Sequence, residues 1–377
     1  MRNKFIAFIF FFLIFKSNAQ SIPLSDKATV SVLTCGTGPE MYSLFGHTAI
    51  RITDPTVLLD IVYNYGAFDF GTPNFVAKFT KGDLQYFVTT DTYTNFLEQY
   101  RYEQRSVYEQ ELNLPSAKKQ ELFDNLNRVL MSDARYYTYK FIDRNCTNMA
   151  VDIINKTLGS KVIYKTKDTE VTYRQTLYPY FDGHFYEQLG TSIIFGKKVD
   201  AQATLLFLPL ELLESLKTAQ YQNAPLASKT KTILDSDKSD NGSSWWNNIY
   251  TYLVFLVVVT LANKKPLTVF YLMLLGLIGI FFSIAGWYSL HRELEYNYNI
   301  LLFNPIYLLL VYFYFRNNYK WIYYISVFLG VTLLIGFTVI ATKIYFWIAL
   351  PIIATNAIIL GRFIRHYHKP DSLPAIE

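Results

Sequence analysis

Apolar and polar positions alternate with a period of two through much of residues 29–114, which is the pattern of half-buried β-strands. In His47–Ile52 the alternation is clear, and Asp54-Pro55 behind it is a turn signal. We therefore expect Leu59–Tyr65 to return as an antiparallel partner. Similar patterns predict strands at 29–34, 84–89 and 106–114, and an extended aromatic stretch at 136–142.

Helical periodicity appears between and after these strands. Residues 92–105 and a segment that begins at Pro115 carry apolar side chains on one face. A third helix is expected after Asn145, a residue suited to the N-cap, and Gly159 is its stop signal. Beyond it the pattern predicts short strands, a last helix at 209–218 and a polar linker at 219–244.

The last third of the chain is apolar in long runs without charge. Each run has 18 or more residues, enough to cross a hydrocarbon core about 30 Å thick. Basic residues cluster in alternate connections and in the tail 362–377, and this bias predicts that they face the cytoplasm. The sequence thus predicts five transmembrane helices, and we set the membrane region at 245–361. The apolar runs that predict them are roughly Ser243–Ala262, Leu267–Leu290, Tyr296–Phe315, Trp321–Thr342 and Ile344–Gly361.

The first residues have the form of a secretory signal. Arg2 and Lys4 precede an eleven-residue apolar run, and Ser-Asn-Ala before Gln20 is a small-residue cleavage pattern. We expect a signal peptide at 1–19 and an exported domain at 20–218. An uncleaved anchor is the alternative. No cysteine follows the apolar run, so the chain is not itself expected to be a lipoprotein.

Composition supports a soluble part joined to a membrane part. Hydrophobic residues make up 51% of the chain and mean hydropathy is +0.14, too apolar for one soluble domain. The net charge of +5 comes entirely from residues after 240, so it follows membrane topology. It gives no indication of nucleic-acid binding.

Cys146 and His47 are the candidate catalytic residues. A thiol at the first position of a helix faces a partial positive charge and free N–H groups, which favour thiolate and can form an oxyanion hole. A histidine at the mouth of a neighbouring strand supplies a base. The alternatives are a small buried thiol and a core histidine. Cys35 is either a buried thiol, a residue lining the site or a disulfide partner of Cys146.

A third polar group is expected to orient the imidazole. If the hairpin turns tightly at 54–57, His47 faces Asn64 across the ladder. A longer turn would put Tyr65 or Asp60 there, because a one-residue slip exchanges the two faces of the strand.

Four short motifs and the order of the segments carry a family resemblance. LTCGTG, SLFGHTAIRI, YNYGAFDFG and RNCTN occur in this order, before FLP and the apolar segments. In this the chain resembles the DUF4105 family, whose described members are Lnb-type lipoprotein N-acyltransferases. The resemblance implies an α+β fold with a permuted papain-like (NlpC/P60, LRAT-like) periplasmic domain, followed by an all-α five-span bundle. It also implies Cys146 as the nucleophile and His47 as the catalytic histidine.

The function implied by this resemblance is acyl transfer in the bacterial inner membrane. A phospholipid would donate an acyl chain to Cys146, and the N-terminal amine of a diacylglyceryl lipoprotein would accept it, without metal or cofactor. The alternatives are a cell-wall peptidase or amidase of the NlpC/P60 type and a non-catalytic membrane scaffold. Candidate substrate-binding residues are Arg51, Tyr65, Asn145, His291 and Asn297, the last two in the polar loop 291–305, which is either a solvated loop or a headgroup site.

Overall fold

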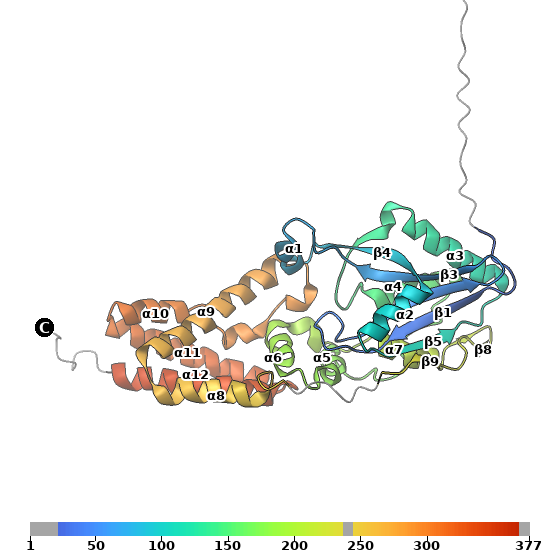
Figure 1. Cartoon of the computed structure of the whole chain (residues 1–377). Helices are drawn as coiled ribbons and strands as arrows, with labels where there is room; N and C mark the ends of the chain where they lie inside the picture. The colour runs from blue at the N-terminus through green and yellow to red at the C-terminus, as the bar shows by residue number, and fades with distance from the viewer. Residues whose placement is uncertain (1–21, 237–243, 369–377) are drawn as a thin grey trace, which may run out of the picture.

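The computed structural model describes residues 22–236 and 244–368 of the chain. A sheet-containing α+β domain forms one end of the molecule and a bundle of helices forms the other (Figure 1). The expected signal peptide at 1–19 and the last residues of the tail lie outside the described residues.

The α+β domain is built on a seven-stranded antiparallel sheet. Its order is β6-β4-β3-β2-β1-β5-β9, and each strand pairs with its neighbour in antiparallel register. The predicted strands are present, but two are shorter than expected: 106–114 is a strand only over Val107–Glu111, and of the extended stretch 136–142 only Tyr136–Thr138 pairs in the sheet. The bounds are β1 (Thr29–Cys35), β2 (His47–Asp54), β3 (Leu59–Ala67), β4 (Gln85–Thr92), β5 (Val107–Glu111), β6 (Tyr136–Thr138) and β9 (Lys231–Leu234).

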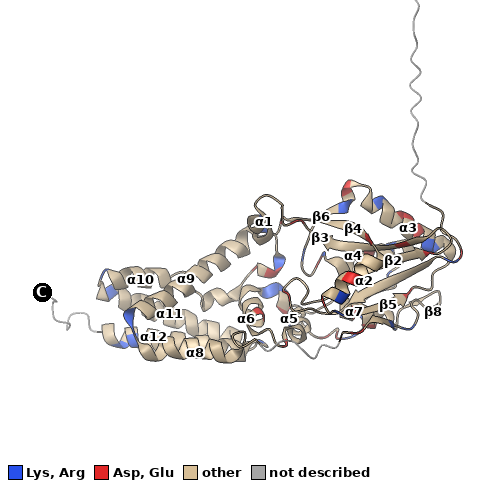
Figure 2. Ribbon diagram, viewed as in Figure 1, with Lys and Arg blue, Asp and Glu red and all other residues tan. Residues whose placement is uncertain are grey.

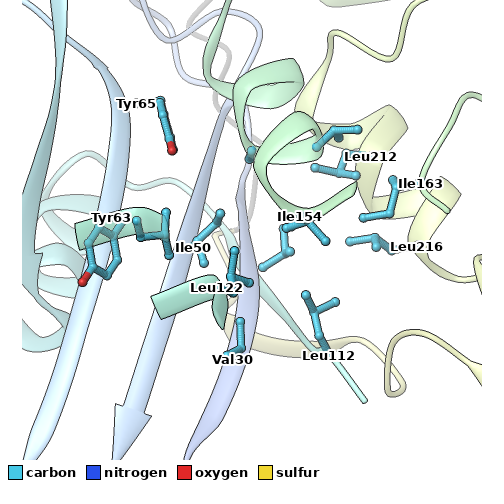
Figure 3. Packing of buried hydrophobic residues seen from close by; sticks show 14 of the residues in the cluster. Val30, Ile50, Tyr63, Tyr65, Leu112, Leu122, Ile154, Ile163, Leu212 and Leu216 are labelled. Atoms are coloured by element: carbon cyan, nitrogen blue, oxygen red, sulfur yellow. The ribbon is translucent and has the colours of Figure 1, made fainter. Parts of the chain in front are cut away.

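Helices cover both faces of this sheet. On one face, α3 (Ser116–Leu130) and α4 (Cys146–Leu158) enclose the main core, which Figure 3 shows with Ile50, Leu122 and Ile154 packed together. On the other face, α2 (Tyr93–Tyr102) packs over a smaller cluster that contains Cys35 and Ala49. The alternation along each strand therefore divides its side chains between two buried layers.

The structure corrects the prediction of a polar linker at 219–244. Much of 219–244 belongs to the α+β domain: β7 (Gln220–Tyr221) and β8 (Ala224–Pro225) form a small hairpin, and β9 completes the edge of the sheet beside β5. Leu226 is fully buried in the main core. The segment reads as a linker because an edge strand needs few apolar side chains, so its sequence carries almost no alternation.

The region between α4 and β7 is also different from expectation. Among the described residues it contains no strand of the main sheet; it holds α5 (Tyr173–Leu177), α6 (Phe185–Ile194) and α7 (Pro209–Leu216), with 3-10 turns between them. Only α7 was predicted. The apolar side chains of α6 pack against the bundle rather than against the sheet.

The bundle contains three described helices that are long and apolar enough to span a membrane. The five-span prediction is therefore supported only in part. Helix α8 has 14 residues, and the expected span Tyr296–Phe315 is broken into a 3-10 turn and the nine-residue α10. A helix of nine residues rises only about 13 Å, too little to cross a bilayer alone. The bundle helices are α8 (Ile249–Ala262), α9 (Lys265–Tyr288), α10 (Tyr307–Phe315), α11 (Tyr319–Ile340) and α12 (Phe346–Tyr367).

Charge is distributed along the bundle as the basic loops predict. Figure 2 shows Lys and Arg at the end of the bundle far from the sheet, while the middle of the helices is without charge. Helix α12 continues to Tyr367, so the first residues of the predicted tail, Arg362 and Arg365 among them, are helical.

Candidate active site

Cys146 is the first residue of α4, as predicted. Asn145 is the N-cap, and its side-chain Oδ1 accepts hydrogen bonds from the backbone N–H groups of Thr147 (2.9 Å) and Asn148 (3.2 Å). The Asn148 side chain accepts from the Asn145 N–H in return, which completes a capping box. Cys146 is therefore held at the positive end of the helix dipole.

The same cap changes one expectation about the site. Two of the N–H groups at the start of α4 are occupied by Asn145 Oδ1, so they are not available as oxyanion donors. The Asn145 amide also donates to the carbonyls of Phe141 (2.7 Å) and Phe207 (2.8 Å). Asn145 was a candidate substrate-binding residue, but its side chain is buried and used entirely by the fold.

His47 opens β2, directly after a sharp backbone turn. Gly46 has φ +81°, and a Cβ there would lie 2.5 Å from the carbonyl oxygen of Cys35, so the position requires glycine. The next residue, Thr48, is hydrogen-bonded through Oγ1 to Thr147 Oγ1 at 3.1 Å, and both side chains are buried. The residues that follow His47 and Cys146 are thus joined to one another.

His47 and Cys146 come together at the end of the sheet. His47, Thr48 and Thr147 lie close to the sulfur. Burial raises the pKa of Cys146, but the neighbouring His47, together with the polar groups of Thr48 and Thr147, outweighs burial and leaves the thiol pKa below its ordinary value. Cys146 remains partly exposed, so a reagent can reach it.

Asn64 contacts His47, although through a different register from the predicted one. The pairing places Asn64 opposite Ala49, two residues from the expected partner, because Asp54 pairs with Leu59 around a longer turn. A shift of two residues keeps the face of the strand, so the side chain still reaches the imidazole diagonally. His47 Nε2 lies 3.2 Å from Asn64 Oδ1. An amide oxygen only accepts, so this contact assigns the proton to Nε2 and leaves Nδ1 of the neutral ring as the base.

Cys35 is a buried free thiol, not a disulfide partner. It is fully buried against α2, and Cys35 and Cys146 are both free. Burial raises the pKa of Cys35 to about 12, against the smaller opposite effects of Tyr100 and Arg105. Cys35 is therefore a poor nucleophile.

Arg51 and Tyr65 have structural surroundings that do not match a substrate-binding role. The Arg51 guanidinium is paired with Asp60 (2.8 Å) and Glu109 (3.1 Å) and lies over the Tyr93 ring, which also removes Asp60 as an orienting group for the imidazole. Tyr65 is 1% exposed and points into the main core (Figure 3), so it does not take the place of Asn64 either.

The loop 291–305 is neither a solvated loop nor an open headgroup site. It joins the bundle to the α+β domain. His291 Nε2 lies 2.9 Å from the Phe79 carbonyl oxygen, and the Asn297 amide donates to the carbonyls of Ile193 and Ile194, both at 2.9 Å. A Cβ at Gly196 would lie 2.0 Å from the Glu295 carbonyl oxygen, so the two backbones are in close contact. His291 and Asn297, both candidate substrate-binding residues, are thus committed to this junction.

An ion-pair network strengthens the junction. Asp200 accepts from Arg174 Nε at 2.7 Å and from the Tyr298 hydroxyl at 2.5 Å, and Lys343 Nζ lies 3.1 Å away. Arg174 also stacks on the ring of Tyr345. Asp200 and Arg174 come from the α+β domain and their partners from the bundle, so the network fixes one part relative to the other.

Sequence reasoning missed Thr48 and Thr147. Each directly follows a candidate catalytic residue, and a threonine in that place is the only signal that could have indicated the bond between them.

In the part of the chain that the structure describes, no group of three or more His, Cys, Asp or Glu side chains is placed to hold a metal ion. A cavity of about 670 Å³, lined by Leu44, Lys165 and Glu211 among others, does not include the thiol.

Comparison with known families identifies the α+β domain. Residues 18–178 match the family model described as the Lnb N-terminal periplasmic domain. This part of the chain is therefore similar to that domain. The match contains His47, Asn64 and Cys146, and the helical bundle follows it. Together with the three long apolar helices, the match indicates a membrane protein with a periplasmic N-terminal domain. No curated protein and no solved structure matches it.

Proposed function

We propose that this protein is a thiol-dependent N-acyltransferase of the bacterial inner membrane. It would move an acyl chain from a phospholipid, through a thioester on Cys146, to the N-terminal amine of a diacylglyceryl lipoprotein. The observation that carries the proposal is that His47 opens β2 and Cys146 opens α4 where the Thr48–Thr147 hydrogen bond joins these two elements; a thiol pKa below its ordinary value agrees with it. The similarity of residues 18–178 to the Lnb N-terminal periplasmic domain supports it.

The first half-reaction is acylation of the enzyme. The thiol proton passes to His47 Nδ1, and the thiolate attacks the ester carbonyl of the phospholipid. The tetrahedral oxyanion faces the N-terminus of α4, where the backbone N–H of Cys146 is the candidate donor. When the intermediate collapses, the C–O bond to glycerol breaks, His47 returns the proton to the leaving alkoxide, and lysophospholipid departs.

The second half-reaction transfers the acyl chain. The neutral α-amine of the lipoprotein attacks the thioester, a new amide bond forms and the C–S bond breaks. His47 takes the proton released by the amine and returns it to the thiolate, which restores the starting enzyme. Asn64 would hold the ring through Nε2, which leaves Nδ1 as the nitrogen that exchanges the proton with sulfur in both steps.

The bundle has a physical role in this scheme. Donor and acceptor are both held in the bilayer, so a site fixed at the membrane surface reduces the cost of bringing them together. The junction at 291–305 and Asp200 provides such fixing. We further propose that the α+β domain is a permuted papain-like fold of the NlpC/P60 and LRAT-like kind, supported by the antiparallel sheet, the thiol at a helix N-terminus and a histidine strand that precedes it in the chain.

Complementation tests the function. Cys146→Ala should leave the protein in the membrane at wild-type level but abolish lipoprotein N-acylation, measured by mass spectrometry of lipoprotein N-terminal peptides. Cys35→Ala is the matched control, because it removes the other thiol and should preserve N-acylation. Persistent N-acylation with Cys146→Ala would refute the proposal. Release of muropeptides from purified sacculi by the wild type would instead favour the peptidase or amidase alternative. A His47→Ala variant without any phenotype would favour the non-catalytic scaffold.

A further inference from the structure

Helix α1 (Phe75–Lys81), between β3 and β4, exposes large apolar side chains. It has no buried residue, and Val76 is 75% and Phe79 50% exposed. In the loop before it, Phe70 is 74% exposed. Several such side chains close together are unusual on a surface that faces water, and they mark a place where another apolar phase binds.

The position of α1 identifies that phase. The helix lies against the end of α9 that is nearer to the sheet (Figure 1). The hydroxyl of Ser289 donates to the carbonyls of Thr80 (3.0 Å) and Lys81 (3.2 Å), and the Leu290 N–H donates to Lys81 O at 2.7 Å. Helix α1 is thus attached to the end of a candidate membrane span.

The apolar surface continues from α1 onto α9. Trp287 is 88% and Tyr288 55% exposed at the end of the span, and Lys81 Nζ lies over the Tyr288 ring. Aromatic side chains and lysines are the residues that collect where a bilayer meets water. Lys78 in the last turn of α1, which is partly exposed, adds a second cation for the phosphate groups of the lipid.

A row of aromatic rings leads from α1 toward the thiol. Phe79 is followed by Phe75 (ring centroids 6.2 Å apart), then by Phe68 (5.9 Å), Tyr86 (5.2 Å) and Tyr139 (4.5 Å). Tyr139 and Cys146 pack against the same core. Burial and then the charge of Cys146 raise the pKa of Tyr139, as expected for near neighbours.

We propose that α1 and the Phe70 loop insert into the outer leaflet of the membrane that holds the bundle, and that they form the entrance through which an acyl chain reaches Cys146. The entrance rests on the proposed function; the insertion does not. The row of rings from Phe79 to Tyr139 gives the acyl chain an apolar surface along its way. The Phe68 backbone continues directly from the strand that carries Asn64, so the entrance and the site share β3.

Insertion is measured with spin labels in the full chain, reconstituted in vesicles of phosphatidylethanolamine and phosphatidylglycerol. Val76→Cys and Leu58→Cys are labelled in a Cys146→Ala background, where Cys35 is buried and does not react. Leu58 is the matched control, since it is 93% exposed and apolar but lies in the turn at the opposite end of β3. The label at 76 should be more accessible to oxygen than to a water-soluble nickel chelate, and the label at 58 the reverse. Equal access of the chelate to both labels would overturn the insertion.

The entrance is measured with Cys146 present. We expect Val76→Asp to slow acylation of Cys146 by vesicle phospholipid about tenfold, because a carboxylate resists entering the acyl-chain region. Leu58→Asp should have the wild-type rate. Alkylation of Cys146 by soluble iodoacetamide should be unchanged in both, which shows that the site is intact. Wild-type acylation by Val76→Asp would overturn the entrance and leave the proposed function in place. A Cys146→Ala protein that still N-acylates would refute the function, while the spin-label result would still decide insertion.

Discussion

Thr48 Oγ1 and Thr147 Oγ1 lie 3.1 Å apart in a buried hydrogen bond that links β2 to α4. Each threonine directly follows a residue of the proposed catalytic pair, so the bond fixes the distance between the strand that carries His47 and the helix that carries Cys146. The two residues of the pair are about a hundred positions apart in the chain. Local sequence alone does not bring them together, and the threonine bond joins their two elements directly.

Removal of this bond should affect both the fold and the reaction, and a double variant separates the two effects. In Thr147→Val the Thr48 hydroxyl loses its partner, and we expect a loss of about 1–3 kcal/mol in stability and a several-fold lower rate of Cys146 acylation. The double variant Thr48→Val/Thr147→Val leaves no unpaired hydroxyl, so its stability should recover while its rate stays low. Thermal melting and single-turnover acylation check the two effects. A double variant with the wild-type rate would show that the bond does not position the pair.

Asn64 is expected to orient the His47 ring. Asn64→Ala should lower the acylation rate roughly 10- to 100-fold, the usual effect of a lost orienting partner, with a small change in KM. Asn64→Asp provides a second readout. A carboxylate beside the imidazole raises the histidine pKa, so the pH–rate profile should move to higher pH. A profile identical to that of the wild type would contradict the orienting role.

The two cysteines should differ in reactivity with pH. Because the pKa of Cys146 lies below its ordinary value, its alkylation by iodoacetamide should reach half its maximal rate below pH about 8.5. His47→Ala removes the main group that lowers the pKa, so the midpoint should rise. Cys35, with a pKa raised to about 12, should stay unmodified in folded protein. Peptide mass spectrometry over a pH series measures all three, and a lower midpoint in His47→Ala would contradict the assignment.

The Asp200 network should stabilise the junction in a pH-dependent way. Burial raises the pKa of Asp200, but Arg174, Tyr298 and Lys343 outweigh burial and lower it below its ordinary value. A carboxyl with a depressed folded-state pKa stabilises the protein fully above its unfolded pKa of about 3.9, and this stability is lost as the pH falls through the folded value.

Asp200→Asn should therefore lower the melting temperature in detergent at neutral pH. Breaking one partner of a buried pair costs about 3 kcal/mol, so a shift of several degrees is expected. The difference from the wild type should shrink below pH 4. Glu121→Gln, which removes an exposed ion pair with Lys118, is the control and should change little. A constant difference across the pH series would contradict the account of Asp200.

Much of the site could be predicted because its signals are local. Asn145 and Gly159 bound α4 through capping, which depends on residues within one turn. Asn64 stayed on the predicted face despite the longer turn, because a shift of two residues preserves the strand face. The approach of His47 to Cys146 depends on strand order; local residue features offered the pair only as one alternative, and the family resemblance favoured it.

The remaining features depend on distant contacts. Helix α1 has no buried residue, so no apolar stripe indicates it, and its place beside α9 is decided by hydrogen bonds from the Ser289 hydroxyl and the Leu290 N–H to the Lys81 carbonyl. The sequence around Asn297 is typical of a solvated loop, and only the folded chain shows that its amide donates to the Ile193 and Ile194 carbonyls of α6. Nine-residue α10 lies in an apolar run long enough for a span, and composition does not show that the run begins with a 3-10 turn.

The central claim is that His47 activates Cys146 to carry an acyl chain. The most direct test is intact-protein and peptide mass spectrometry of the full chain, reconstituted with a phospholipid of one defined acyl composition. The account predicts one acyl mass on the peptide that contains Cys146, removed by neutral hydroxylamine or by a diacylglyceryl-cysteine peptide, and absent in His47→Ala. An acyl group on another residue, or an undiminished adduct in His47→Ala, would contradict it.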